Sequence, residues 1–242
     1  MRYAIVADIH GNLEAFIEVK KQLKKQNIDK YICLGDIVGY GANPKECLEL
    51  SKRLFDVIIA GNHDWACCGL FDVKYFNPYA REAVLWTQNV INEEEKNFLR
   101  SLPLTCQVDD FEIVHGSLYH PDEFNYILSI SDALKTFKLM KTQICFIGHS
   151  HAPAVFSRDE KNRIEYIDRN EVRLENNLSY IINVGSVGQP RDGNPKSSYC
   201  IYDRDKKVIK IERIAYPVAI TRDKIIKAGL PPFLAIRLGS GR

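Results

Sequence analysis

The sequence lacks a strong charge of either sign. Its 33 lysines and arginines nearly balance 31 aspartates and glutamates, so the formal net charge is only +2. A broad polyanion-binding surface needs a marked basic excess, and we therefore expect no long nucleic acid as a partner. Long apolar runs are missing too: no segment approaches the roughly twenty apolar residues of a spanning helix. The first apolar run ends at Asp8, which is too short for a signal peptide, so we expect no membrane association.

The cysteines lack the spacing of a metal site or of a disulfide framework. There are seven, an odd number, and Cys33 and Cys145 lie inside apolar runs where a thiol behaves as a small buried hydrophobe. The vicinal pair Cys67 and Cys68 leaves a redox-sensing role open. This cysteine usage predicts a reducing, cytoplasmic location.

Histidine is scarce, and its placement is the most informative feature of the chain. Five of the 6 histidines fall in four short islands, and a fifth island adds a carboxylate. The islands are DIH at 8–10, GD at 35–36, GNHD at 61–64, HG at 115–116 and GHSH at 148–151. Mixed carboxylate, amide and imidazole groups suit transition-metal ions better than Ca²⁺, which prefers oxygen ligands only. The islands therefore predict a pair of divalent transition-metal ions.

Each island follows a short apolar run, as in RYAIVADIH and KYICLGD. Runs rich in valine, isoleucine and alanine predict strands that are buried on both faces, as in an α/β sheet. Asn12 and the Asn43-Pro44 pair are typical helix starts, so the first three strands alternate with helices. That order favours a parallel sheet. Since ligands gather beyond the carboxyl ends of such strands, we expect the islands to converge.

Residues 65–105 break this alternation and look helical. Asn77-Pro78 predicts one helix start, and Asn92 with Glu95 predicts a capping box at another. We expect this helical insert to lie beside the site. Its aromatic side chains either cover a nucleoside base or pack the insert onto the domain; they are Trp65, Phe71, Tyr75, Phe76 and Tyr79.

The second half of the chain predicts one further helix at 131–140 and then a change of character. Residues 154–216 alternate polar and apolar residues in short runs, which predicts mainly antiparallel strands that complete a second sheet. A closing helix is expected to be capped by Thr221 and to end near Gly229. His120 does not follow an apolar run as the other histidines do, so we expect it to lie in a surface loop. Without a linker or repeat, residues 1–242 are predicted to form a single domain.

The ordered motifs DxH, GD, GNHD, HG and GHxH resemble the signature of the calcineurin-like metallophosphoesterase superfamily across residues 8–151. NVGSVGQPRDG at 183–193 resembles the bacterial and archaeal branch related to small phosphodiesterases. The resemblance implies an α/β fold, namely a four-layer α/β/β/α sandwich of two mixed sheets with the helical insert near the active site. It also implies two divalent ions, Mn²⁺ or iron first, with Zn²⁺, Co²⁺ and Ni²⁺ as further candidates.

The resemblance implies a role for each island. Asp8, His10, Asp36 and His151 would hold one ion, and Asp36, Asn62, His115 and His149 would hold the other. A metal-bridging hydroxide would attack a small phosphomonoester or phosphodiester, with a nucleotide among the candidates. Asn62 would also contact the substrate, His63 would protonate the leaving oxygen, and Asp64 would orient the His63 ring.

One departure from the family pattern is informative. Protein Ser/Thr phosphatases of this superfamily carry GDxxDRG, in which the arginine grips phosphate, whereas this chain has GDIVGYG with Gly39 and Tyr40 at those places. This difference argues against a phosphoprotein phosphatase, which stays an alternative. Arg191 is the candidate to replace the missing arginine, although a structural turn role fits its sequence context equally well. Tyr40 either lines the pocket or packs.

Two other functions compete with a small-substrate phosphoesterase. A metal-binding scaffold of the same fold would not need the non-ligand His63–Asp64 pair, and scaffold relatives resemble versions that have lost ligands. A nuclease would need a basic groove lined with aromatic residues, which the sequence does not show. Phosphomonoesters, phosphodiesters, cyclic nucleotides and dinucleoside polyphosphates all remain open as substrates, and so does the oligomeric state.

Overall fold

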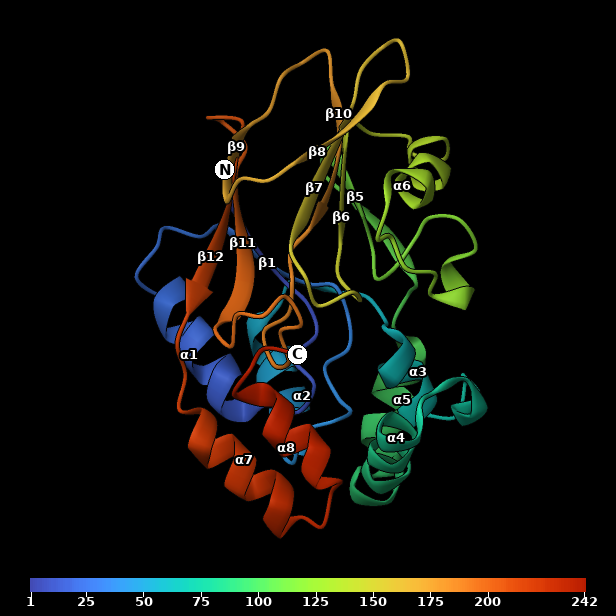
Figure 1. Cartoon of the computed structure of the whole chain (residues 1–242), viewed down its shortest axis with the longest axis vertical. Helices are drawn as coiled ribbons and strands as arrows, with labels where there is room; N and C mark the ends of the chain where they lie inside the picture. Colours follow the sequence, from blue (N-terminus) through green and yellow to red (C-terminus); the bar gives the residue numbers. More distant parts are fainter.

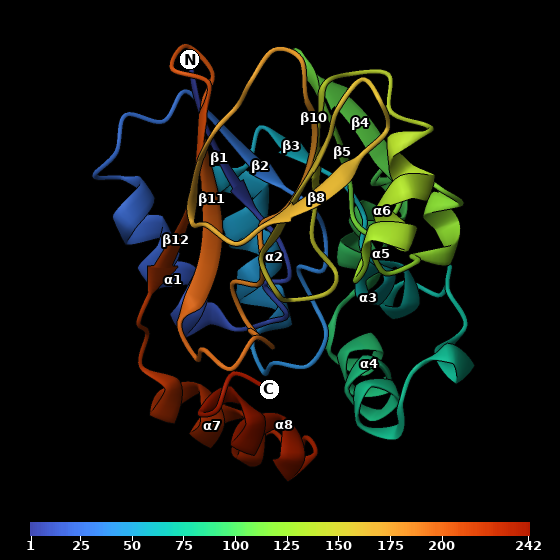
Figure 2. The same cartoon turned by 45° about the horizontal axis from the view of Figure 1, so that its top comes forward.

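The computed structural model describes all of residues 1–242. Two mixed β-sheets of six strands each face one another, and helices cover their outer faces (Figures 1 and 2). This is the α/β/β/α sandwich predicted from the sequence. None of its helices combines the length and the apolar character that crossing a bilayer requires.

The first sheet joins the first three strands of the chain to three late ones. Its order is β3-β2-β1-β11-β12-β9, in which β1, β2 and β3 are parallel and β11 pairs antiparallel with β1. The strands are β1 (Arg2–Val6), β2 (Lys30–Cys33), β3 (Val57–Ile58), β9 (Glu171–Arg173), β11 (Ser197–Asp203) and β12 (Val208–Ile214).

The second sheet has the order β4-β5-β6-β10-β7-β8, with β5, β6 and β10 parallel. Its strands are β4 (Thr105–Val108), β5 (Phe111–Val114), β6 (Ile144–Ile147), β7 (Ala154–Arg158), β8 (Ile164–Ile167) and β10 (Ser179–Asn183). The prediction that residues 154–216 complete the second sheet holds for β7, β8 and β10 but is wrong for β9, β11 and β12, which join the first sheet. Alternation marks a strand but carries no information about which sheet it joins.

Three apolar clusters separate the four layers. Along β1, Tyr3 and Ile5 face the second sheet, whereas Ala4 and Val6 face the helices on the outer side. Successive side chains of a strand point to opposite faces, so this continuous apolar run buries both. A third cluster, which includes Phe137, fills the space between the second sheet and its helix. The cluster that contains Tyr3 and Ile5 packs the two sheets face to face.

The helices divide into an outer cover and two additions. In Figure 2, α1 and α2 lie on the outer face of the first sheet and α6 on that of the second, while the insert helices and the C-terminal pair project beyond the sheets. The helices are α1 (Leu13–Leu23), α2 (Pro44–Leu54), α3 (Asn62–Cys67), α4 (Pro78–Val90), α5 (Glu93–Ser101), α6 (Ile130–Phe137), α7 (Val218–Lys227) and α8 (Pro232–Leu238).

Local capping explains most helix starts. The side chains of Asn12 and Asn77 accept hydrogen bonds from the third residue beyond each, and Asn92 with Glu95 forms the predicted capping box. The Thr221 prediction is wrong: α7 begins earlier, after Pro217, and Thr221 lies inside the helix. Its hydroxyl instead donates to Asn12 Oδ1 at 3.0 Å, which ties α7 to the start of α1.

Candidate metal centre and substrate pocket

The structure brings all five islands together where strands of both sheets end. Asp8 and His10 follow β1, Asp36 follows β2, and Asn62 and His63 open α3 after β3. His115 follows β5, and His149 and His151 follow β6 of the second sheet. Each of these side chains is at most 8% exposed. The centre therefore lies where the carboxyl ends of strands from both sheets meet, and each sheet supplies part of its residues.

The ligand atoms form two groups that share one carboxylate. In each group, one candidate ligand atom from every residue lies within 4.8 Å of those from the others. The groups are Asp8, His10, Asp36 and His151, and then Asp36, His115 and His149. Asn62 offers an amide oxygen as a further donor for the second group, and this buried Oδ1 has no hydrogen-bond partner. Asp36 thus holds the bridging place that the resemblance implies.

The imidazole rings are oriented to offer lone pairs to a cation. His10 Nδ1 lies 3.1 Å from the Val38 carbonyl and His151 Nδ1 lies 2.6 Å from the Gln189 carbonyl. A carbonyl only accepts, so each Nδ1 carries the hydrogen and each Nε2 is left with a lone pair. The two Nε2 atoms face one another at 3.0 Å. Two lone pairs at this distance repel unless a cation lies beside both, which fits a metal site.

Unpartnered oxygens complete the donor set. Asp8 Oδ1 and Asp36 Oδ2 are buried without a hydrogen-bond partner, and so is His115 Nε2. The other oxygen of each carboxylate is anchored: Asp8 Oδ2 accepts from the His149 amide at 3.0 Å, and Asp36 Oδ1 from the His63 amide at 2.8 Å. A buried unsatisfied polar atom costs about 1–3 kcal/mol. Several of them converging on one point fit divalent ions, which supply the missing partners.

Burial keeps most of these histidines neutral, as ligands must be. It lowers the pKa of His10, His149 and His151 well below the usual value, and that of His63 to about 4. His115 differs: burial lowers its pKa, but the charges of Asp36 and Asp8 and the hydrogen bonds to Asp36 and the Leu34 carbonyl together outweigh burial and raise the pKa to about 9. A metal ion and this proton would compete for the same place.

The backbone is strained where the ligands leave their strands. Five of the candidate ligands have positive φ angles, between 51° and 68°, which non-glycine residues seldom adopt. They are Asp8, His10, Asp36, His149 and His151. Neighbouring loops hold this conformation, since the Asp8 amide donates to Gly35 O and the His10 amide to Asp36 O. The left-handed turns direct Asp36, the pair Asp8 and His10, and the pair His149 and His151 into the centre.

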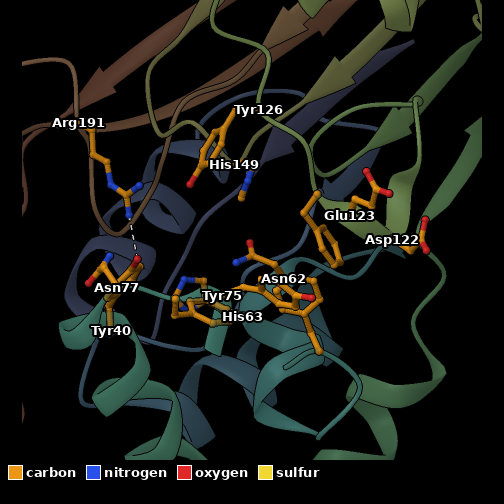
Figure 3. A pocket seen from close by; sticks show the side chains of 13 residues that line it. Tyr40, Asn62, His63, Tyr75, Asn77, Asp122, Glu123, Tyr126, His149 and Arg191 are labelled. Carbon is orange, nitrogen blue, oxygen red and sulfur yellow. Dashed lines mark hydrogen bonds between the residues drawn. The ribbon is translucent and has the colours of Figure 1, made fainter. Parts of the chain in front are cut away.

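A cavity of about 530 Å³ opens above the centre (Figure 3). Asn62, His63 and His149 lie on its floor, and Arg191 lies at its edge. The Arg191 guanidinium donates to Gln189 Oε1 at 2.9 Å and to the Tyr40 hydroxyl at 3.1 Å, so it is held facing the cavity. Arg191 therefore lines the cavity as well as belonging to the turn at 189–193.

Comparison with known proteins agrees with this geometry. A sequence model of the calcineurin-like phosphoesterase superfamily domain matches residues 1–207. The chain belongs to the calcineurin-like phosphoesterase family. An uncharacterized protein of Methanocaldococcus jannaschii is 41% identical over 99% of this chain and 98% of its own length.

Two solved structures extend the likeness to the whole fold. A metallophosphoesterase from Sphaerobacter thermophilus has a TM-score of 0.88 and 38% identity, covering 100% of this chain and 99% of that one. A hypothetical protein from Pyrococcus horikoshii has a TM-score of 0.80 at 20% identity, covering 100% and 98%, and shares the fold. The C-terminal pair α7 and α8 lies beyond the matched family domain but within these full-length likenesses.

Asp64 does not play the part that the family resemblance implied. Its carboxylate accepts hydrogen bonds from the backbone amides of Asp36, Ile37, Val38 and Gly61 at 2.7–3.2 Å, and none from the His63 ring. Asp64 occupies the third position of α3, from which a carboxylate reaches back to the residue before the helix. It therefore positions the loop that carries Asp36, and the expectation that it orients His63 is wrong.

Gly39 makes room for the His63 ring in this member of the family. Gly39 has φ +88°, and a Cβ there would lie 2.4 Å from His63 Nδ1. The aspartate found at this place in the protein phosphatases would therefore displace the ring. Tyr40 packs its ring 4.4 Å from that of His63 and also lines the cavity, so both readings of Tyr40 hold.

The insert contributes to the cavity, but only in part. Phe71, Tyr75 and Phe76 line it. Trp65 packs against Phe124, and Tyr79 stacks on Phe233 of α8 outside the cavity. The aromatic set is thus divided: three rings line the cavity, while Trp65 and Tyr79 pack against other parts of the fold.

The segment 117–128 supplies a wall that the sequence reasoning missed. Tyr126 stacks on His149 with ring centroids 3.9 Å apart, and Asp122, Glu123 and Phe124 also line the cavity. The signal was available, because LYHPDEFNY directly follows the HG island. His120, in the same segment, is exposed and does not line the cavity, as expected for a loop histidine.

Proposed function

We propose that this protein is a dinuclear metal-dependent phosphoesterase that uses one water to convert a small phosphoester into an alcohol and a phosphate product. The observation that carries the proposal is the convergence of buried, unpartnered donor atoms around the shared Asp36, directly beneath a cavity. A metal carrier would need the donors but not the cavity. The residue roles below belong to the same proposal.

Two ions would be held by the groups described above, with Asn62 added to the second. When bound, they would lower the pKa of a water and neutralise charge on the phosphoryl oxygens. Mixed imidazole, carboxylate and amide donors suit Mn²⁺ or iron, and also Zn²⁺, Co²⁺ and Ni²⁺.

The residues of the cavity would bind the substrate and move its proton. Arg191 and Asn62 would contact the phosphoryl oxygens. Burial lowers the pKa of His63 to about 4, so its ring is neutral at pH 7 in the metal-free protein. A phosphate dianion beside the ring would raise this pKa and let His63 deliver a proton to the leaving oxygen.

Hydrolysis of p-nitrophenyl phosphate and bis-p-nitrophenyl phosphate with Mn²⁺ tests the proposal. We expect turnover that is lost on chelation, restored by Mn²⁺ and sharply reduced by His63→Ala, whereas the control His120→Ala leaves it unchanged. Turnover that is indifferent to chelation or to His63→Ala would sink the mechanism. Stoichiometric metal without turnover of any phosphoester would favour the scaffold alternative.

The departures at Gly39 and Tyr40 argue against a phosphoprotein phosphatase, because the His63 ring fills the space of the missing aspartate side chain. We also infer a cytoplasmic location, since six of the seven free thiols are buried and none is paired.

A further inference from the structure

We propose that the cavity selects esters of a single phosphate carried on a nucleoside, and that Asp122 and Glu123 are specificity-determining residues that repel a second phosphate. This inference rests on the proposed phosphoesterase function. It narrows the substrate within that function by the charges and rings of the cavity wall.

The charges of the cavity are separated. Arg191 is the only lysine or arginine that lines it, and Asp122 and Glu123 lie on the opposite side (Figure 3). Neither acid forms an ion pair, and Glu123 accepts only from Asn125 Nδ2, at 2.9 Å. Lys74, near the rim at Tyr75, is paired with Asp72 at 2.8 Å. A second phosphate that points away from Arg191 would therefore meet two carboxylates and no balancing cation.

The two acids are held in place. They belong to a short 3₁₀ turn, Pro121–Glu123, and Phe124 directly after it is buried. The Phe124 ring packs on Trp65 at 5.6 Å and on Phe71 at 5.4 Å. The turn is thus fastened to the insert, which keeps both acids beside the cavity. From there they can accept hydrogen bonds from sugar hydroxyls or from an exocyclic amino group.

A line of rings leads outward from the catalytic histidine candidate. Phe76 lies 4.7 Å from His63, Phe71 lies 5.9 Å from Phe76, and Tyr75 lies 5.5 Å from Phe71, measured between centroids. Tyr75 lines the cavity and is 70% exposed, so much of its ring surface stays accessible beside Lys74 Nζ, which lies 5.1 Å from the ring centroid. Aromatic faces of this kind stack on nucleobases without regard to base identity.

The size of the cavity agrees with this substrate class. Its volume of about 530 Å³ falls within the range of about 300–1,000 Å³ that is usual for small-molecule sites. A nucleotide would place its phosphate at Arg191, its base at Tyr75 and its sugar between them, so each part would contact a different side of the cavity. A phosphoprotein substrate would leave the rings and the acids without a matched partner.

The repulsion of a second phosphate by Asp122 and Glu123 is tested with adenosine 5′-monophosphate and adenosine 3′,5′-bisphosphate, which offer the same kind of ester bond. We expect the wild-type protein with Mn²⁺ to favour the monophosphate in kcat/KM. In the double variant Asp122→Asn, Glu123→Gln, the ratio of kcat/KM for the monophosphate to kcat/KM for the bisphosphate should fall roughly tenfold, because kcat/KM for the bisphosphate rises. Added salt should reduce the preference for the monophosphate more in the wild-type protein than in the double variant.

Matched controls make the outcome readable. Glu160→Gln with Glu165→Gln changes the net charge equally, outside the cavity, and should leave the preference unchanged. Tyr75→Ala should raise KM several-fold for the monophosphate but not for glycerol phosphate, while Tyr79→Ala should alter neither. An unchanged preference in the acid variant overturns the role of Asp122 and Glu123. Turnover of p-nitrophenyl phosphate without any nucleotide turnover overturns the substrate class, whereas absence of all turnover rejects the phosphoesterase function itself.

Discussion

The floor and the wall of the cavity are built in different ways. The floor lines the cavity through Asn62, His63 and His149 and continues beneath it through the other strand-end residues Asp8, His10, Asp36, His115 and His151; all eight are buried and several are strained. The wall includes Phe71, Tyr75, Asp122, Glu123, Tyr126 and Arg191, which come from loops and short 3₁₀ turns and are mostly exposed. Rigid strand ends fix the donor atoms, while loops vary around them. We infer that the floor sets the chemistry and the wall sets the choice of substrate.

The largest effect is expected from the floor residue that both metal groups share. Asp36→Asn keeps the shape of the side chain but removes its charge, so we expect both ions to bind poorly. Activity should fall by more than about 10³-fold, because several kcal/mol of transition-state stabilisation depend on the ions. Metal analysis and kcat of the same preparation check this. Two retained ions with near-normal kcat would show that Asp36 does not bridge.

His63→Ala should separate chemistry from metal binding within the floor. We expect kcat to fall about 10²-fold with both ions retained, since a positioned proton donor contributes at least that much. The measurement is kcat with leaving groups of graded pKa. A loss that is equal for good and poor leaving groups would contradict proton donation by His63.

Arg191→Ala tests whether this residue of the wall binds the phosphate of the substrate. We expect KM for phosphate esters to rise about tenfold with a smaller change in kcat, because the guanidinium holds phosphate oxygens in a partly exposed site. The control is Arg213→Ala, which removes an arginine outside the cavity. If the two variants behave alike in steady-state kinetics, Arg191 has only a structural role.

The smallest effect is expected at the Tyr40 hydroxyl, which accepts from Arg191 at 3.1 Å. Tyr40→Phe keeps the ring packed on His63 but removes the hydrogen bond, so KM should rise only about two- to threefold. Combining it with Arg191→Ala should add nothing, because the hydroxyl acts through the guanidinium. Full additivity of the two changes in a double-mutant cycle would refute that link.

The floor was predictable from the sequence, whereas most of the wall was not. Short apolar strands that end in Asp, Asn or His leave a local signal, and parallel strands bring their ends to one edge. The place of LYHPDEFNY just after the HG island was a signal that this segment lies near the site. The side of the cavity that Tyr126 and Glu123 occupy depends on how Phe124 packs against Phe71 and Trp65 of the insert, which no local pattern encodes.

The errors have equally physical causes. Asp64 satisfies amides at the start of α3, and that competing demand removes it from the His63 ring. Thr221 resembles a cap in sequence, but α7 begins at Val218 and the Thr221 hydroxyl inside it bonds to Asn12. The late strands divide between two sheets because β11 pairs with β1, a contact across most of the chain length.

The central claim is that the buried floor holds two ions and that hydrolysis depends on both. Titrating metal-free protein with Mn²⁺, while bound metal and p-nitrophenyl phosphate hydrolysis are followed in the same sample, tests it most directly. We predict that activity reaches its plateau at two ions per chain. A plateau at one ion, or activity that does not follow metal content, would contradict the account.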